Sequence, residues 1–282
     1  METTDIFILI FTGTAGGILS GMLGVGGGVV YILVLPMVLQ HAGFADSEVV
    51  PYIVTNSLFA TFIAGLINVI LLIRSGFFFY RAVLWLSLDA CIAAVIVYFF
   101  ILPQPWYSKD VFTLLIIFLM IPMSIQLIRP SPKVMNSDET VQNNKDELTP
   151  FQYSVAGTLG GLITSLSGLG GGLIVVPVLN VLMKLNIKKA SSVSLGMVTI
   201  VSLLISLINF FQHHEIKQPE NAGVHTIGFL IPEISLWLVV GVLAGAPLGS
   251  FFAKKASVGF LRKLFGIFLI FVIIKKIFDL VI

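Results

Sequence analysis

Two glycine-rich runs hold the residues best suited to binding a ligand. The first, Gly13–Gly28, reads GTAGGILSGMLGVGGG, and the second, Gly157–Gly172, reads GTLGGLITSLSGLGGG. Eight of the sixteen positions are identical at a constant offset of 144. Each run ends in three consecutive glycines, which are Gly26, Gly27 and Gly28 in the first run and Gly170, Gly171 and Gly172 in the second. Glycine destabilises a helix by about 1 kcal/mol relative to alanine, so each triplet predicts a break in its helix.

A helix that restarts after such a break presents free N–H groups and about half a positive charge. Because glycine has no side chain, a ligand can approach this backbone closely, and both features favour an anion. Neither run has a Walker lysine or a Rossmann context, which argues against nucleotide binding. A tight turn with no ligand is the alternative for either run alone. Paired, glycine-broken apolar segments indicate the central site of a transporter.

The apolar block that follows each run opens with small polar residues. Hydroxyl and amide groups at membrane depth can bind an oxyanion without a buried lysine, and hydrogen bonds to the carbonyl four residues earlier are the alternative. Two asparagines further along the same blocks are expected to bridge helices instead. The small polar residues are Thr55, Asn56 and Ser57 in the first half and Ser191, Ser192 and Ser194 in the second, of which all but Ser191 are the candidate ligands; the bridging pair is Asn68 and Asn209.

Asp89 is the one acidic residue well inside an apolar block. A charge at mid-membrane costs about 2.5–3.5 kcal/mol on insertion scales, so such a residue needs a function or a partner. Aligning the two Leu-Trp-Leu triplets places Asp89 where the second half has Gly241. We therefore consider Asp89 either a proton carrier that couples transport or an ion-pair partner of Arg74 or Arg81.

The composition identifies the setting of these residues as a lipid bilayer. Of 282 residues, 57% are hydrophobic and only 11% charged, with a mean hydropathy of +1.04. Charged and turn residues separate eight apolar blocks, and a polar linker at 129–150 divides them into halves at 1–128 and 151–282. The net charge of +2 gives no indication of nucleic-acid binding. The histidines at 213, 214 and 225 share a loop without metal-ligand spacing, so neither a metal nor a cofactor is predicted.

The first block of each half is too long for one straight span. Residues 6–40 contain no charge, and as a helix they would measure about 52 Å against a hydrocarbon core of about 30 Å. We predict a hairpin that turns at the glycines and returns to its starting side; two long, tilted helices are the alternative. The glycines spaced by four at 13, 17 and 21 and at 241, 245 and 249 are expected to serve close helix packing.

Loop charge supports the hairpins. If all eight blocks crossed the membrane, Lys and Arg would divide equally, with eight on each side. With two hairpins, twelve lie on the face of loops 74–81, 129–150, 184–189 and 254–263, and four lie opposite. The basic face is cytoplasmic by the positive-inside rule, which places both termini outside. The predicted fold is an all-α polytopic membrane protein of two inverted repeats. Each repeat has a glycine-broken hairpin and three transmembrane helices, giving about ten helical segments.

The duplicated G-T-x-G-G…G-x-G-G-G pattern with a following proline resembles the sulfite exporter TauE/SafE family of membrane permeases. The closing segment GVLAGAPLGSFFAKKASVGFLRKLFGIFLI fits the family too. The resemblance implies a multi-pass protein of the bacterial cytoplasmic membrane that transports sulfite or organosulfur anions such as sulfonates. By motif match it assigns substrate contact to Gly26–Gly28, Gly170–Gly172, Thr55, Ser57, Ser192 and Ser194. The block reading SLDACIAAVIV departs from the family's glycine-spaced pattern at Asp89.

These observations together predict a secondary transporter, acting in export, for a small sulfur-containing anion held between two half-helix N-termini. Its expected partners are that anion and the lipid bilayer, with proton coupling through Asp89, and the sequence does not define an oligomeric state. A channel or a carrier for other small organic anions is the alternative within transport. A membrane scaffold is the alternative outside it. An enzyme is not predicted, because no nucleophile and base cluster at membrane depth.

Overall fold

The protein is built from α-helices. The computed structural model describes residues 3–44, 49–102, 104, 109–128, 149–183, 185, 187–211 and 224–255, and nine single residues between 260 and 277. Within these residues there are nine α-helices and no strand, which confirms the predicted all-α class. The helices are α1 Thr3–Leu23, α2 Gly28–His41, α3 Val49–Arg74, α4 Tyr80–Phe100, α5 Lys109–Ile128, α6 Pro150–Ser167, α7 Gly172–Pro177, α8 Ile187–Phe211 and α9 Pro232–Lys255. A π-helical segment, Val178–Leu182, continues α7.

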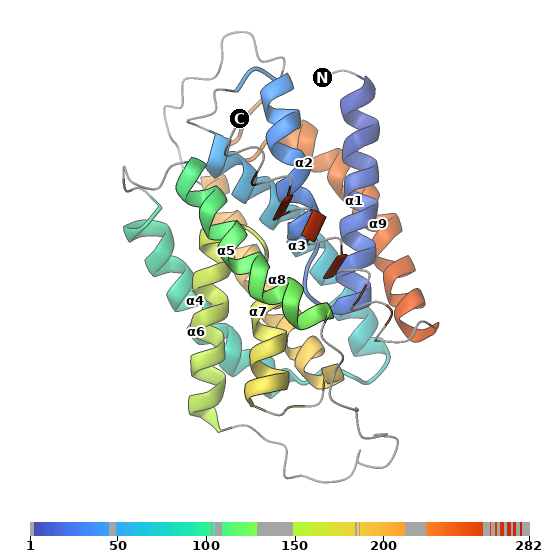
Figure 1. Cartoon of the computed structure of the whole chain (residues 1–282), viewed down its shortest axis with the longest axis vertical. Helices are drawn as coiled ribbons and strands as arrows, with labels where there is room; N and C mark the ends of the chain where they lie inside the picture. Colours follow the sequence, from blue (N-terminus) through green and yellow to red (C-terminus); the bar gives the residue numbers. More distant parts are fainter. Residues whose placement is uncertain are drawn as a thin grey trace.

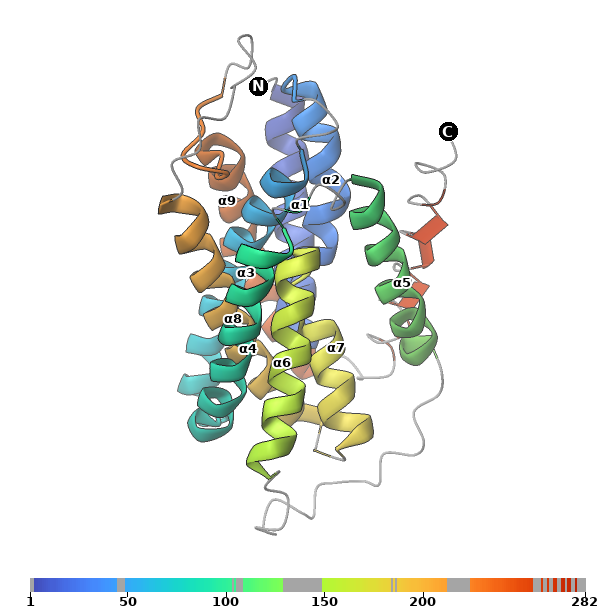
Figure 2. The ribbon, with the colours of Figure 1, turned by 90° about the vertical axis from the view of Figure 1, so that its left-hand side faces the viewer.

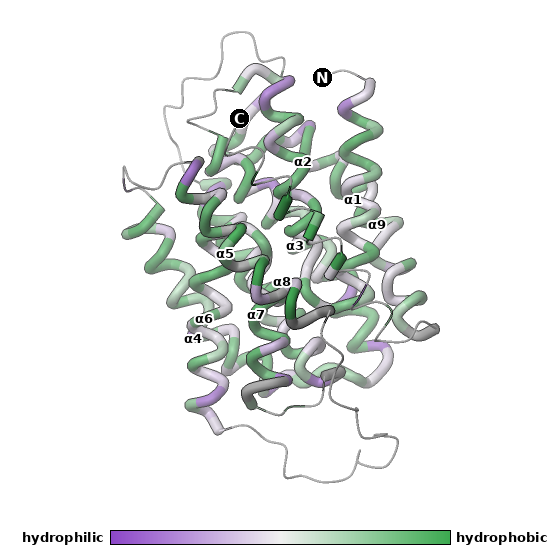
Figure 3. The backbone as a smooth tube through the Cα atoms, in the orientation of Figure 1, coloured by the Kyte–Doolittle hydropathy of each residue, from purple (hydrophilic) through white to green (hydrophobic). Residues whose placement is uncertain are grey.

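Five of these helices, α1, α3, α4, α8 and α9, are long and apolar enough to cross a bilayer. Hydrophobic residues cover most of their length (Figure 3). Large apolar side chains also face outward, and Phe11, Leu84 and Phe118 are each more than half exposed. Such surfaces are unfavourable in water but match the acyl chains of lipid. The protein is therefore a polytopic membrane protein, as predicted.

Both long apolar blocks break at their glycines. In the first block α1 ends at Leu23 and α2 begins at Gly28, and the connection uses positive φ angles of 69° at Gly24 and 85° at Gly26. In the second block α6 ends at Ser167 and α7 begins at Gly172. Gly168, Gly170 and Gly171 have φ between 61° and 88°, a region that other residues enter only at a cost. The alternative of two unbroken, tilted helices is wrong.

The two hairpins enter the bundle from opposite ends. Helices α1 and α2 occupy the end that holds the N-terminus, whereas α6 and α7 occupy the other end (Figures 1 and 2). The α3–α4 connection lies at the α6–α7 end (Figure 1). This placement brings Arg74 and Arg81, which flank that connection, to the same end as the start of α6. The linker predicted at 129–150 lies outside the described residues except for Thr149 and Pro150.

The first helix of each hairpin packs along a long helix of the other half of the chain, α1 on α9 and α6 on α4. The glycine stripes of α1 and α9 make this contact. A Cβ at Gly17 would lie 2.8 Å from the amide nitrogen of Ala246, and one at Gly21 would lie 2.5 Å from the carbonyl oxygen of the same residue. The expected packing role of these stripes is confirmed. On the other side, Gly157 and Gly161 of α6 lie equally close to the α4 backbone at Leu86 and Ala90.

Two buried asparagines join helices, as their positions predict. The side-chain amide of Asn68 on α3 donates to Ser20 Oγ on α1 at 3.1 Å, and Ser250 Oγ on α9 donates to Asn68 Oδ1 at 2.8 Å. Asn209 on α8 accepts at Oδ1 from the hydroxyl of Tyr98 on α4 at 2.7 Å. These hydrogen bonds thus tie α3 to α9 and α8 to α4, each time across the two halves of the chain.

Candidate functional site

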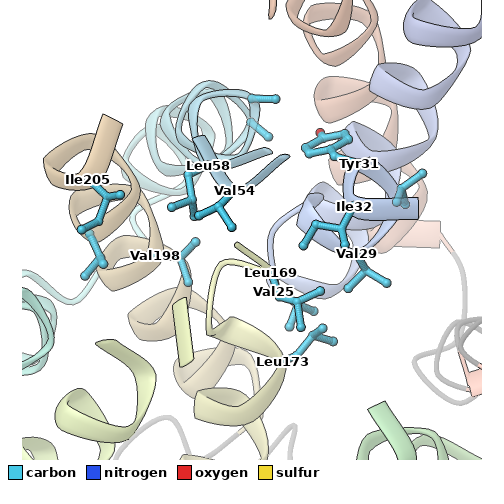
Figure 4. Close-up of a cluster of buried hydrophobic side chains, with 14 of the residues drawn as sticks. Val25, Val29, Tyr31, Ile32, Val54, Leu58, Leu169, Leu173, Val198 and Ile205 are labelled. Atoms are coloured by element: carbon cyan, nitrogen blue, oxygen red, sulfur yellow. The ribbon is translucent and has the colours of Figure 1, made fainter. Parts of the chain in front are cut away.

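The two glycine breaks meet each other in the interior of the bundle. A Cβ at Gly28 would lie 2.7 Å from the carbonyl oxygens of both Gly168 and Leu169. From the other side, a Cβ at Gly172 would lie 2.8 Å from the carbonyl oxygen of Val25. Val25 and Leu169, the apolar residues within the two breaks, lie side by side (Figure 4). The fold therefore brings together glycines that are 144 positions apart in the sequence, and we call this contact the hairpin crossing.

The crossing carries backbone donors that are not used. The N–H groups of Gly26 and Gly27, and those of Gly170 and Gly171, make no hydrogen bond to any described residue. The 14-residue helix α2 begins at Gly28 and directs its positive end toward the crossing. Buried N–H groups are nearly always paired, with protein or with another ligand. A bound anion is one such partner.

Two predicted serine ligands, Ser57 and Ser194, differ in their hydrogen bonds. The hydroxyl of Ser57 on α3 donates to the carbonyl oxygen of Gly168 at 2.9 Å and lies 3.5 Å from that of Gly28, so it contacts both breaks. Ser194 on α8 is equally buried, and its hydroxyl has no hydrogen-bond partner among the described residues. Ser57 thus stabilises the closed crossing, and Ser194 retains a free donor.

Thr61, which was not among the predicted ligands, also lies at the crossing. Its methyl carbon Cγ2 would be 3.1 Å from a Cβ at Gly26 and 3.0 Å from one at Gly170. Val198 on α8 lies against the same two glycines, at 3.6 and 3.2 Å. The available signal was spacing, because Thr61 follows Ser57 by one helical turn and therefore shares its face of α3.

Three other predicted ligands lie in α3 and α8 away from these contacts. The amide group of Asn56 is fully used: Nδ2 donates to the carbonyl oxygens of Tyr52 and Phe229, and Oδ1 accepts from Ile231 N and Ser235 Oγ. Ser192 Oγ donates to the carbonyl oxygen of Phe77 at 2.8 Å. In this conformation Asn56 fixes the start of α3 to the loop before α9. Ser192 fixes the start of α8 to the loop before α4. Thr55 is buried in α3.

Asp89 lies half-buried in α4. Within the described part of the chain it forms no ion pair, so the pairing with Arg74 or Arg81 considered above is not observed. No described hydrogen bond connects it to the crossing. A different pair, His225 and Glu233, joins the loop to the start of α9 at 3.0 Å, while His213 and His214 lie outside the described residues. The described residues hold no group of three potential metal ligands.

The surroundings of the crossing are largely apolar. Val25, Leu58, Leu169 and Val198 are buried there (Figure 4), and the buried ring of Tyr31 lies against Gly27. An anion bound at this place would be held by backbone dipoles and hydroxyl groups and not by a cationic side chain. This arrangement binds a negative charge without keeping a fixed positive charge in the membrane.

A model of one protein family matches residues 9–276, nearly the whole chain, and its description is sulfite exporter TauE/SafE. The chain belongs to this family. A protein of Methanocaldococcus jannaschii named a "probable membrane transporter protein" is 25% identical over 257 residues, covering 90% of this chain and 89% of its own length. A Haemophilus influenzae protein of the same name is 26% identical over 276 residues, covering 96% and 98%. No solved structure matches the chain. This TauE/SafE member is thus related over most of its length to proteins named as membrane transporters.

Proposed function

We propose that this protein is a secondary transporter that exports a small sulfur-containing anion, such as sulfite or an organosulfonate, across a bacterial cytoplasmic membrane. The hairpin crossing is the observation that carries the proposal. It has free backbone N–H groups at Gly26, Gly27, Gly170 and Gly171. The unpartnered hydroxyl of Ser194 lies one helical turn before Val198, which contacts the same glycines. These donors can replace the hydration shell of an oxyanion. The family name supports sulfur chemistry for the substrate.

We further propose that the halves 1–128 and 151–282 are inverted repeats that move against each other. Two features support this: the hairpins enter from opposite ends, and α1 on α9 matches α6 on α4. In the present conformation the two breaks touch, so the anion binds only when they separate. Rocking of one repeat against the other would separate them toward one side of the membrane at a time. Asp89 is then the candidate for proton coupling.

The test is transport by purified protein in liposomes. Uptake of sulfite, thiosulfate, sulfoacetate and acetate should be compared with and without a pH gradient. The proposal predicts saturable movement of at least one sulfur anion and little movement of acetate. Transport of acetate in preference to every sulfur anion would favour a carrier for other organic anions. No transport of any sulfur anion by folded protein would refute the substrate assignment.

A channel is distinguished in the same liposomes by counterflow. A carrier that alternates access exchanges external labelled anion against unlabelled anion inside, and the labelled anion accumulates transiently. A channel lets the anion follow its gradient without such accumulation. The contact between the breaks favours the carrier, because the backbone of one hairpin closes the path at the other.

A further inference from the structure

The position of Thr61 suggests a role beyond that of the predicted ligands. Thr61 and its neighbours Gly26 and Gly170 form a contact that both glycine breaks share. It is completely buried, and its hydroxyl oxygen has no hydrogen-bond partner among the described residues. A buried hydroxyl without a partner costs about 1–3 kcal/mol, so a well-packed interior rarely keeps one without a reason.

Four other threonine hydroxyls show how a hydroxyl in a helix is usually paired, by a hydrogen bond to its own helix. Thr12, Thr14, Thr164 and Thr199 each donate to the carbonyl oxygen four residues earlier, at 2.6 to 2.8 Å. Thr61 lies in the interior of α3 and has the same option, yet it does not use it. Its methyl group faces the two glycines, and the hydroxyl on the same Cβ is left without a described partner. Rotation about the Cα–Cβ bond exchanges these two groups and turns the hydroxyl toward the breaks.

Val198 makes the opposite side of this place apolar. It lies against the same two glycines as Thr61 but can only offer methyl groups. With the Thr61 hydroxyl turned toward the breaks, a ligand between α3 and α8 would meet a hydrogen-bond donor on one side and an aliphatic surface on the other. Sulfite and sulfonates have this asymmetry, because three oxygens lie on one side of sulfur and a lone pair or a carbon lies on the other. Sulfate presents oxygen on every side, so one of its oxygens would be buried against Val198 without a partner.

We propose that Thr61 donates a hydrogen bond to the transported anion and that the Thr61–Val198 pair selects anions with one oxygen-free side over sulfate. The inference rests on the proposed function, since it concerns the same crossing and the same substrate class. Beyond the proposed function, it assigns Thr61 as a ligand of the anion and explains how the site would select against sulfate. Leaving a buried charged oxygen unpaired is what makes such selection strong.

Isosteric exchanges test the pair in proteoliposomes. Thr61→Val keeps the shape and removes the donor, and it should raise the KM for sulfite about tenfold or more, as expected for a lost hydrogen bond to a charged group. Thr61→Ser keeps the donor and should stay within about threefold of wild type. Thr12→Val removes a hydroxyl that bonds only to its own helix, so it serves as the matched control with unchanged KM.

Val198→Thr gives an independent readout of selection. It supplies a donor on the second side, and we expect sulfate to become a competitor of sulfite transport at concentrations at least tenfold lower than in wild type. Melting temperatures of the purified variants establish that each is folded. If Thr61→Val and Thr12→Val show the same KM, or if Val198→Thr leaves sulfate inhibition unchanged, the proposal is overturned while the transport function stands. If the wild type transports no sulfur anion, both proposals fail.

Discussion

Substitution of Gly28 by alanine tests whether the two hairpins touch. Gly28 begins α2 and is not among the glycines with positive φ, so alanine strains no backbone angle there. The added Cβ would lie 2.7 Å from two carbonyl oxygens of the other hairpin. An ordinary contact needs about 3.5 Å, so the hairpins must separate by roughly 0.8 Å. Overpacking of a dense interior typically costs about 1–3 kcal/mol, and we expect Gly28→Ala to destabilise the protein by this amount.

Gly172→Ala creates the matching clash from the other side, 2.8 Å from the carbonyl oxygen of Val25. One separation of the hairpins relieves both clashes, so the double variant should lose clearly less stability than the sum of the two single variants. The assay is the thermal unfolding of each purified variant in one detergent, together with its transport rate. Gly76→Ala is the control, because no atom lies within 4 Å of its added Cβ and its φ of 72° leaves only backbone strain. The Gly76→Ala variant should be somewhat less stable than wild type but keep the wild-type transport rate.

The result that would refute this reasoning is a Gly28→Ala protein with wild-type unfolding temperature and wild-type transport. Strict additivity of the two substitutions would also contradict it, since it would mean that the clashes are relieved by separate movements. A selective loss of transport, with stability unchanged, would place Gly28 in anion contact but not in a closed crossing.

Four further substitutions test other parts of the structure. Ser57→Ala should lower the free energy of unfolding by about 1 kcal/mol, measured by calorimetry, because it removes the hydrogen bond to Gly168. Ser194→Ala should leave the unfolding temperature unchanged and weaken anion transport, measured by uptake, because its hydroxyl has no partner in the described residues. Asp89→Asn should abolish the stimulation of transport by a pH gradient and preserve counterflow, if the carboxylate carries the coupled proton. Gly245→Ala should prevent stable expression, since its Cβ would meet the backbone of Thr14 on α1, and size-exclusion chromatography would show the loss of monodisperse protein.

Several elements of the fold could be predicted because their signals are local. Three adjacent glycines in an uncharged stretch weaken a helix wherever the stretch lies, and both breaks occur there. Glycines spaced by four mark a face that approaches another helix, and the α1–α9 contact uses this face. The bridging roles of Asn68 and Asn209 follow from the need to pair an amide within apolar helices.

The site was harder to predict, because its geometry depends on contacts between distant segments. Asn56 is adjacent to Ser57 in the sequence, but the two side chains leave α3 in different directions, one toward residues 229–235 and the other toward the crossing. Sequence alone treats both as equal candidates. The role of Thr61 could not be predicted from the sequence, because its neighbours Gly26 and Gly170 come from both halves of the chain. Only the packed structure shows which hydroxyls are already bonded and which remain available.

The central claim, that the transported anion binds where the two glycine breaks meet, can be tested most directly with selenite as a heavy analogue of sulfite. Crystals of the protein soaked with selenite should be measured at the selenium absorption edge, after competition with sulfite transport has been shown in liposomes. The account predicts an anomalous peak between residues 26–28 and 170–172, within hydrogen-bonding distance of their N–H groups and of Thr61. A selenium peak elsewhere in the bundle, from protein whose sulfite transport selenite inhibits, would contradict it.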